Sequence, residues 1–420
     1  AGTGSEIRRR RLVAGLLEQA TAAEQEFLAR LLLGEVRHGA LEGVVADAIG
    51  VAALVPADEV RRALMYGGDL GEVAVAAMGG GLESLRGFRL RLFRPVQPML
   101  AQSAPDVAAA LEATGPAAAE YKYDGARIQV HRKGGQVAVF TRSLSEVTDR
   151  MPEVVAAVKR AKATSLVLDG EAVVMGHDGR PRPFQETAGR FGSAAGAAAQ
   201  LTPIFFDLLY LNGKDLTGLP ESGRHRALAG ALPPDLVVPR IADADADAIE
   251  EFMAESLERG HEGVVVKSID APYQAGRRGA AWVKVKPVHT LDLVVLAAEW
   301  GHGRRQGLLS NLHLGARDPG SGGFVMLGKT FKGLTDEMLG WQTRRFLELE
   351  TGRDGNTVIV RPEQVVEVAF DGVQASTRYP GGVALRFARV RGYRDDKAAS
   401  EADTIETVRD IHRGAGRSAP

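Results

Sequence analysis

The most informative segment of this chain reads Glu120-Tyr121-Lys122-Tyr123-Asp124-Gly125-Ala126-Arg127. It places a lysine between apolar runs and follows it with Asp-Gly, which is unusual for a purely structural position. For an isolated pattern of this kind, an exposed turn with a solvated lysine is the usual outcome. A nucleophilic lysine must be deprotonated to attack, so its pKa has to be lowered by burial or by neighbouring cations. The surrounding sequence therefore decides between a turn and a reactive amine.

Three later segments supply the charged groups that phosphoryl transfer requires. Residues 168–171 read Leu-Asp-Gly-Glu and residues 261–267 read His-Glu-Gly-Val-Val-Val-Lys, so both place charged side chains at the ends of apolar strands. Residues 282–286 alternate as Trp-Val-Lys-Val-Lys, which puts Lys284 and Lys286 on one face of a strand. Singly, such residues are more often solvent-exposed than catalytic. Together and in this order, they favour cations that stabilise a phosphoryl group and carboxylates that hold a divalent metal.

The pattern along the chain predicts a multidomain protein with three regions. Residues 1–90 are rich in Ala, Leu and Glu and predict an α-helical domain, in which 24–45 has the spacing of an amphipathic helix and the glycines at 79–81 break the pattern. Residues 91–288 mix strand and helix signals and predict an α+β domain with antiparallel sheets. Residues 289–420 carry short strand-like runs and predict a small β-barrel, with an OB-fold as the leading candidate. The expected strands are 126–131, 136–141, 166–175, 204–211, 264–267, 293–297, 312–315, 324–329, 358–360, 365–370 and 385–390; the expected helices after residue 90 are 152–162, 224–231, 248–259 and 335–349, and 193–199 is expected to be a loop.

The composition is that of an ordinary globular protein, with 45% hydrophobic and 25% charged residues. There are no cysteines, which excludes disulfides and cysteine-ligated zinc. The formal net charge of −1 neither supports nor excludes DNA binding, because basic residues can gather on particular faces. No apolar run approaches the roughly 20 residues that span a bilayer, and the arginines at 8–11 directly follow Ile7. We therefore expect no membrane association and a cytoplasmic location.

The segments named above, together with Phe140-Thr141-Arg142 and Phe205-Phe206-Asp207, resemble the motifs of the covalent nucleotidyltransferases. That superfamily comprises DNA ligases, RNA ligases and mRNA capping enzymes. A late segment, 389–397, resembles the final motif on the OB domain of that superfamily. Within the superfamily, the ATP-dependent DNA ligases are favoured, because 94–101 resembles the entry to their nucleotidyltransferase domain. The helical region also resembles their DNA-binding domain at 2–5 and 33–40.

The resemblance implies roles in binding ATP for the matched residues. Lys122 is expected to be the nucleophile that carries AMP. Glu120 is expected to accept a hydrogen bond from the adenine amino group, and Phe206 to stack on the base. Arg127 and Glu171 are expected to hold the ribose. The residues expected to contact AMP or phosphates are Arg142, Lys267, Arg278, Lys284 and Lys286, with Arg394 and Lys397 reaching in from the OB domain.

The resemblance also implies a metal and a nucleic-acid partner. Glu171 and Glu262 are expected to bind Mg²⁺, with Mn²⁺ as the alternative. Nicked double-stranded DNA is the expected partner of a monomeric enzyme. A Gly-rich loop that opens a helix offers backbone N–H groups to a phosphate, so part of the DNA contact is expected there. The residues assigned to DNA binding are Gly4, Ser5 and Arg37.

Three alternatives compete with a DNA ligase that uses ATP. An RNA ligase or a capping guanylyltransferase would share the lysine chemistry, but the helical region argues against both. A ligase that uses NAD typically carries a cysteine zinc site, which this chain lacks. A scaffold that kept the fold and lost the activity would have no need to keep every charged position of the motifs. The family's helical domain is usually longer, so we expect this chain to lack its first helices.

Overall fold

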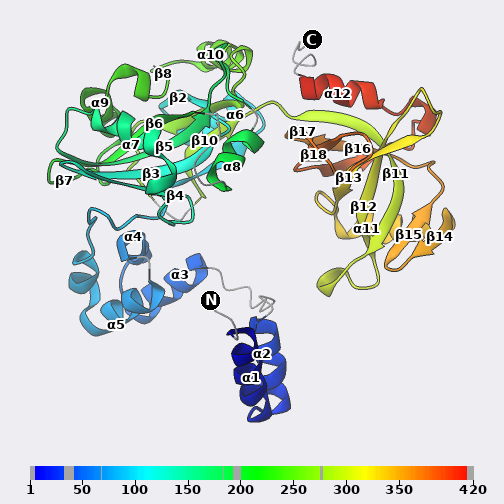
Figure 1. Cartoon of the computed structure of the whole chain (residues 1–420), viewed down its shortest axis with the longest axis horizontal. Helices are drawn as coiled ribbons and strands as arrows, with labels where there is room; N and C mark the ends of the chain where they lie inside the picture. Colours follow the sequence, from blue (N-terminus) through cyan, green and yellow to red (C-terminus); the bar gives the residue numbers. More distant parts are fainter. Residues whose placement is uncertain are drawn as a thin grey trace.

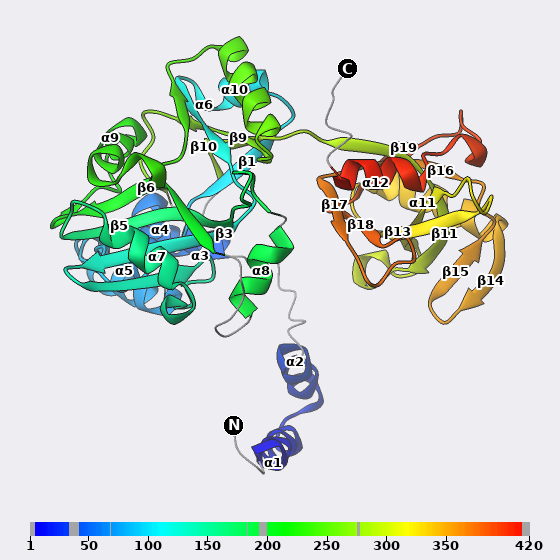
Figure 2. The ribbon, with the colours of Figure 1, turned by 45° about the horizontal axis from the view of Figure 1, so that its top comes forward.

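The helical region begins the chain and divides into two parts. A computed structural model of the protein describes residues 5–32, 42–67, 69–182, 184–192, 200–274 and 278–413. The first two helices lie beside each other and away from the rest of the molecule in both Figure 1 and Figure 2. The next three helices bury a shared core that includes Val60, Leu64, Val73 and Leu85. The helices are α1 (Ser5–Glu18), α2 (Ala22–Leu32), α3 (Glu42–Ala52), α4 (Ala57–Gly67) and α5 (Leu70–Arg86).

Two expectations for the helical region can be compared with these helices. The helix expected over 24–45 is present where the structure describes that stretch, with 24–32 in α2 and 42–45 in α3; residues 33–41 lie outside the described residues. The break expected at the glycines 79–81 is confirmed at Gly81, which leaves helical geometry with φ 58° and ψ −143°. It produces a kink within α5 rather than the end of the element.

The middle region consists of two five-stranded sheets whose inner faces meet. The first sheet has the order β1-β10-β9-β2-β8 and the second β4-β3-β5-β6-β7. All pairings are antiparallel except that of β1 with β10. The strands are β1 (Leu100–Ala104), β2 (Ala117–Lys122), β3 (Ala126–Lys133), β4 (Gln136–Thr141), β5 (Ser165–Val174), β6 (Leu201–Leu211), β7 (Lys214–Asp215), β8 (Arg240–Ala242), β9 (Gly263–Ser268) and β10 (Arg278–Val285).

Helices cover the outer faces of both sheets. Apolar residues of α6 and α10 pack on the first sheet, and those of α7 and α9 pack on the second. The inner faces share a smaller cluster that joins Trp282 of β10 to Val167 of β5 and also includes Met65 of α4. The hydroxyl of Tyr66 on α4 lies 2.6 Å from that of Thr217, which ties the helical region to the middle one. The helices are α6 (Val107–Thr114), α7 (Pro152–Lys159), α8 (Phe184–Gly192), α9 (Glu221–Ala231) and α10 (Ala246–Glu258).

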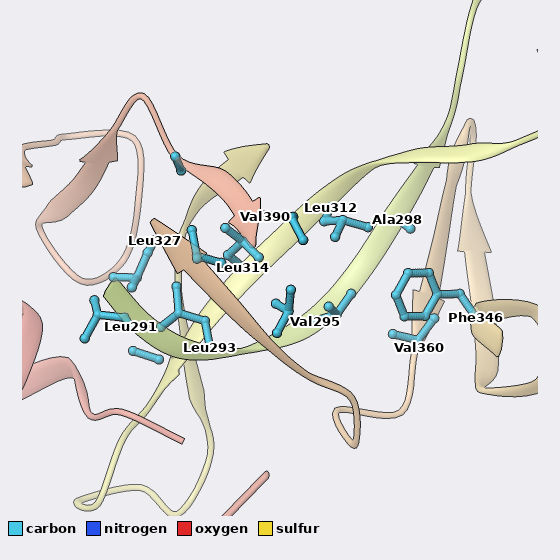
Figure 3. Packing of buried hydrophobic residues seen from close by; sticks show 14 of the residues in the cluster. Leu291, Leu293, Val295, Ala298, Leu312, Leu314, Leu327, Phe346, Val360 and Val390 are labelled. Carbon is cyan, nitrogen blue, oxygen red and sulfur yellow. The ribbon is translucent and has the colours of Figure 1, made fainter. Parts of the chain in front are cut away.

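The third region is built around the long strand β11 (His289–Trp300). The first half of β11 pairs with β16 and the second half with β15, so the sheet curves around a core of aliphatic residues and Phe346 (Figure 3). Its sheet has the order β13-β12-β11-β15-β14, with β19 added beside β16. The remaining elements are β12 (Leu309–Arg317), β13 (Phe324–Thr330), α11 (Asp336–Glu348), β14 (Glu350–Asp354), β15 (Thr357–Val360), β16 (Val365–Phe370), β17 (Gly372–Ala375), β18 (Val383–Arg386), β19 (Arg389–Tyr393) and α12 (Ile405–Arg413).

The structure supports the coarse prediction of a multidomain protein with helices and antiparallel sheets. Across the described ranges, strand pairing in the third region does not form a closed ring, so the OB barrel stays a prediction, as do the boundaries at 90 and 288. The single strand expected at 385–390 is wrong, because Phe387 adopts φ 55° and separates β18 from β19. The loop expected at 193–199 lies outside the described residues. Within the described part of the chain, no helix combines the length and apolarity needed to cross a bilayer.

Candidate active site

Strand β2 presents two charged residues on the inner face of the first sheet. Glu120 and Lys122 are two positions apart, so both point to the same side of the strand. Between them, Tyr121 points to the opposite side, where its ring lies 4.6 Å from that of Phe252 on α10. The neighbouring strand pairs Gly263 with Lys122, which brings the residue before it, Glu262, to the end of β2. The site therefore has two ends, one at Glu120 and one at Lys122.

Two glycines allow the strands around Lys122 to approach closely. A Cβ atom on Gly263 would lie 2.3 Å from the carbonyl oxygen of Val285, and the backbone there has φ 137°. A Cβ atom on Gly125 would lie 2.5 Å from the carbonyl oxygen of Ala172. Any side chain at either position would force the backbone apart. This is the structural reason for glycine after Asp124 and after Glu262.

The amine of Lys122 is surrounded by carboxylates. Its Nζ atom forms an ion pair with Glu262, and both side chains are only about one-fifth exposed, at 21% and 19%. Burial lowers the pKa of Lys122, but Glu262, Glu171 and Asp124 together raise it above its ordinary value. Burial raises the pKa of Glu262, while Lys122 and Lys286 bring it below its ordinary value. In this state the lysine is protonated and the glutamate is ionised.

The second sheet contributes Arg127 and Glu171 opposite Lys122. Burial raises the pKa of Glu171 to about 7, with Lys122 and Arg127 opposing that shift. Arg127 is fixed by Asp169 through hydrogen bonds of 2.9 and 2.6 Å. Its guanidinium lies 5.1 Å from the centre of the Phe206 ring, within cation–π range. The structure thus brings together three residues that were expected to bind AMP.

Lys284 of β10 and Lys286, directly after that strand, extend the cationic side of the site. Lys284 faces inward on the same side as Trp282, and within the described ranges it takes part in no ion pair. Burial lowers the pKa of Lys284, and Lys286 and Lys122 lower it further. Lys286 forms a 2.7 Å ion pair with Asp371 of the third region. A cluster of lysines at this edge is suited to phosphate oxygens.

The third region also contacts the site through Arg386 of β18. Its Nη1 atom lies 2.7 Å from Oδ2 of Asp124, two residues after Lys122. Within the third region, Arg389 forms an ion pair of 3.3 Å with Asp371, the residue that also pairs with Lys286. Neither Arg386 nor Asp371 was among the residues expected at the site from the sequence. Asp371 precedes Gly372, but that Asp-Gly pair lies in the third region, far along the chain from the segments that the resemblance matched, and Arg386 has no glycine neighbour.

The Glu120 end is more deeply buried. The two oxygens of Glu120 are held by Lys267 at 2.5 Å and by Arg240 of β8 at 3.1 Å. Lys267 also donates a 3.1 Å hydrogen bond to the carbonyl oxygen of Phe206. Lys267 was expected at a phosphate, and the structure places it beside Glu120 instead. Arg240 and its partner Glu221 on α9 were not foreseen.

The remaining expected residues lie elsewhere or outside the description. Arg142 is exposed after the end of β4. Arg394 and Lys397 form ion pairs with Asp292 of β11, at 3.1 and 2.5 Å, rather than with the carboxylates around Lys122. Arg278 begins β10 and Ser5 begins α1, but their side chains lie outside the described part of the structure. Gly4 and Arg37 lie outside the described residues altogether.

Comparison with known proteins covers all three regions. Family models match for the DNA ligase N terminus over residues 1–50, the ATP dependent DNA ligase domain over 98–286, and the ATP dependent DNA ligase C terminal region over 305–397. A probable DNA ligase of Anaeromyxobacter sp. (strain Fw109-5) is 60% identical over 98% of this chain and 80% of its own length. A probable DNA ligase of Nocardioides sp. (strain ATCC BAA-499 / JS614) is 59% identical over 97% and 80%. A solved structure described as Pmar-Lig_PreS3 shares the fold, with a TM-score of 0.53 and 20% identity over 78% of this chain and 76% of that one.

Proposed function

The chain belongs to the ATP-dependent DNA ligase family, and we propose that it seals nicks in duplex DNA with Lys122 as the residue that carries AMP. One observation supports this assignment above the others. Lys122 lies at the end of β2 among Glu262, Glu171 and Asp124, and Lys284 of β10 and Lys286 lie close enough to affect the pKa values of this cluster. A nucleophile, carboxylates and cations therefore converge on one point between two sheets. Phosphoryl transfer needs this combination of positioning and charge.

In the first step, Nζ of Lys122 forms a bond to the α-phosphorus of ATP. The bond from that phosphorus to the bridging oxygen breaks, and pyrophosphate leaves with the electron pair. Before it attacks, Lys122 must give up a proton, and its ion pair with Glu262 opposes this loss. Lys284 has no carboxylate partner within the described ranges, so it is the cation on hand for the phosphate oxygens.

The carboxylates near Lys122 fit a magnesium ion. Mg²⁺ is usually held by one or two carboxylates plus substrate phosphates, rather than by a cage of protein ligands. Glu262 and Glu171 would be its protein ligands, and Mn²⁺ would fit the same oxygens. When bound, the ion would neutralise phosphate charge and compete with Lys122 for Glu262, which lowers the pKa of the amine.

The later steps use the same groups to move AMP. The adenylate passes from Lys122 to the 5′-phosphate at the nick, and the amine recovers its proton. The 3′-hydroxyl then forms the phosphodiester bond to that phosphorus, and AMP leaves. We propose that the enzyme acts as a cytoplasmic monomer and that the helical and C-terminal regions, the latter as an OB-fold, hold the duplex by its backbone without sequence preference.

Incubation with α-labelled ATP and Mg²⁺ tests the assignment of the lysine. We expect label that stays with the protein through a denaturing gel and is lost in Lys122→Ala. The labelled enzyme, freed of ATP, should then pass its label to nicked duplex DNA and produce a sealed strand. Label of equal strength in Lys122→Ala would refute the assignment of Lys122. A labelled enzyme that cannot seal a nicked duplex would refute the substrate.

A further inference from the structure

Four buried charges form a closed network at the Glu120 end of the site. Glu120, Lys267 and Glu221 are each 1% exposed. Lys267 and Arg240 hold the two oxygens of Glu120, and Arg240 reaches Glu221 through two further contacts, one of them 2.8 Å long. Two carboxylates and two cations leave the network with no net charge. Buried charges persist when they are paired and hydrogen-bonded in this way.

We propose that Arg240, anchored by Glu221, is the positioning residue that makes the nucleotide site prefer adenine to a 6-oxopurine. The inference rests on the proposed function, in which the base of ATP lies against Glu120. An aromatic side chain is in place for a base, because the half-buried ring of Phe206 lies 4.9 Å from Nζ of Lys267. Glu120, Lys267 and Phe206 therefore lie together at one end of the site.

The chemical basis is the direction of one hydrogen bond. Adenine carries an amino group at position 6, which donates, whereas guanine and hypoxanthine carry a carbonyl oxygen there, which accepts. An ionised carboxylate only accepts hydrogen bonds, but a protonated carboxyl group can also donate one. Selection of adenine therefore requires Glu120 to stay ionised and correctly oriented. A 6-oxopurine would instead bring its accepting carbonyl oxygen against the accepting carboxylate, and such a mismatch disfavours that ligand.

The network maintains this ionisation against burial. Burial raises the pKa of Glu120 above its ordinary value. The charge of Lys267 opposes the rise, the charge of Glu221 adds to it, and the charge of Arg240 opposes it. The other titratable groups on this side are Glu221 and His225, both on α9. Burial and then Arg240 lower the pKa of His225 to about 4, so its imidazole is neutral and adds no charge. Without Arg240, only Lys267 would remain to keep Glu120 ionised.

The geometry assigns this task to arginine rather than to a general cation. Arg240 is shared between two carboxylates, and its planar group can serve both at once. Glu221 fixes the plane of the guanidinium, and that plane fixes Oε1 of Glu120. A lysine at this position could supply the positive charge, but it lacks the planar group that holds Glu120 and Glu221 in two fixed directions at once. We therefore expect Arg240→Lys to restore part of the selectivity that Arg240→Gln loses.

The test measures covalent adduct formation with ATP and with inosine triphosphate, which differs from ATP at position 6. The parent should prefer ATP strongly. Arg240→Gln should reduce the ATP-to-ITP ratio of kcat/KM about tenfold or more, chiefly by raising KM for ATP. Glu221→Gln should shift the ratio in the same direction by a smaller factor. The matched control is Arg160→Ala, because Arg160 forms a two-point pair with Asp235 at 2.8 Å on the surface of the same region.

An unchanged ATP-to-ITP ratio in folded Arg240→Gln and Glu221→Gln would overturn the inference. If Arg240→Gln loses its thermal unfolding transition, Arg240→Lys and Glu221→Gln decide the question, because each retains part of the network. An equal loss with both nucleotides would show that Arg240 only supports the fold, which also overturns its selective role. Failure of the parent to form an adduct with either nucleotide would instead overturn the proposed function.

Discussion

The two ends of the active site lie two residues apart on β2 and are built in opposite ways. At Glu120, two carboxylates meet two cations, and the side chains of Glu120 and Lys267 are each 2% exposed. At Lys122, three carboxylates surround one amine, and its side chain is 21% exposed. The first arrangement pairs its charges within the middle region, whereas the carboxylates of the second also depend on cations from elsewhere, since Arg386 of the third region pairs with Asp124 and Lys286 lowers the pKa of Glu262. A rigid end for recognition thus lies beside a reactive end that must exchange partners.

The reactive end should depend on its lysine absolutely. Lys122→Ala should reduce adduct formation with ATP below detection and leave the thermal unfolding of the protein close to that of the parent. Lys122→Arg should be nearly as inactive, because a guanidinium stays protonated and cannot attack phosphorus. The measurement is the label retained on a denaturing gel. Adduct formation by Lys122→Arg at a rate near that of the parent would contradict the assignment of Lys122 as the nucleophile.

Loss of one carboxylate should have a smaller but still large effect. Glu262→Ala frees Lys122 from its ion pair but removes a ligand for the metal, so we expect nick sealing to fall by about 100-fold or more. Steady-state sealing rates across a range of Mg²⁺ concentrations measure the loss. Glu255→Ala is the control, because Glu255 pairs with Arg259 on the surface. A rate equal to that of the parent would mean that Glu262 serves only to hold the lysine.

Two residues of the third region, Arg394 and Lys397, should be needed only for the first step of the reaction, in which Lys122 forms the adduct with AMP. Arg394 and Lys397 are paired with Asp292 here, and the family resemblance implies that they orient the pyrophosphate. The double variant Arg394→Ala, Lys397→Ala should slow adduct formation at least tenfold and largely spare sealing of a nick that already carries 5′-AMP. Both substrates are compared at matched salt, with Arg361→Ala as the control. Equal losses on the two substrates would assign the pair to DNA binding or stability.

The weakest expected effect concerns stability and pH. The pKa of Glu171 is raised to about 7 from 4.5, so the folded protein binds this proton more tightly than the unfolded chain. The resulting stabilisation is complete below pH 4.5 and is lost as pH rises through about 7. Glu171→Gln removes the titration, so the ligand-free variant should gain about 3 kcal/mol over the parent at pH 8 and much less at pH 5. Thermal unfolding at both pH values measures the difference, and a gain independent of pH would contradict it.

Local sequence signals predicted most of the strands of the middle region and the gathering of Lys122, Glu171 and Glu262. Alternation and glycine position carry that information, because they describe a single strand and its nearest neighbours. They did not foresee the Arg240–Glu221 pair, which joins a short strand to a helix, or the Arg386–Asp124 pair, which joins two regions. Such contacts depend on how whole elements pack. The break at Gly81, by contrast, was predicted from the run of glycines at 79–81, because such a signal is local.

Only Lys286, Pro287 and Val288 separate β10 from β11, so the third region is tethered within about 10 Å of the sheet that bears the lysine. When the pair between Arg386 and Asp124 opens, its partners therefore remain at an effective concentration on the order of millimolar. Diluting the protein cannot lower that value, because the encounter is intramolecular. Ionic strength acts instead on the ion pair itself, because its side chains are 24% and 29% exposed and salt screens their attraction. The opening of the site is thus set by the salt around each molecule and not by the number of molecules present.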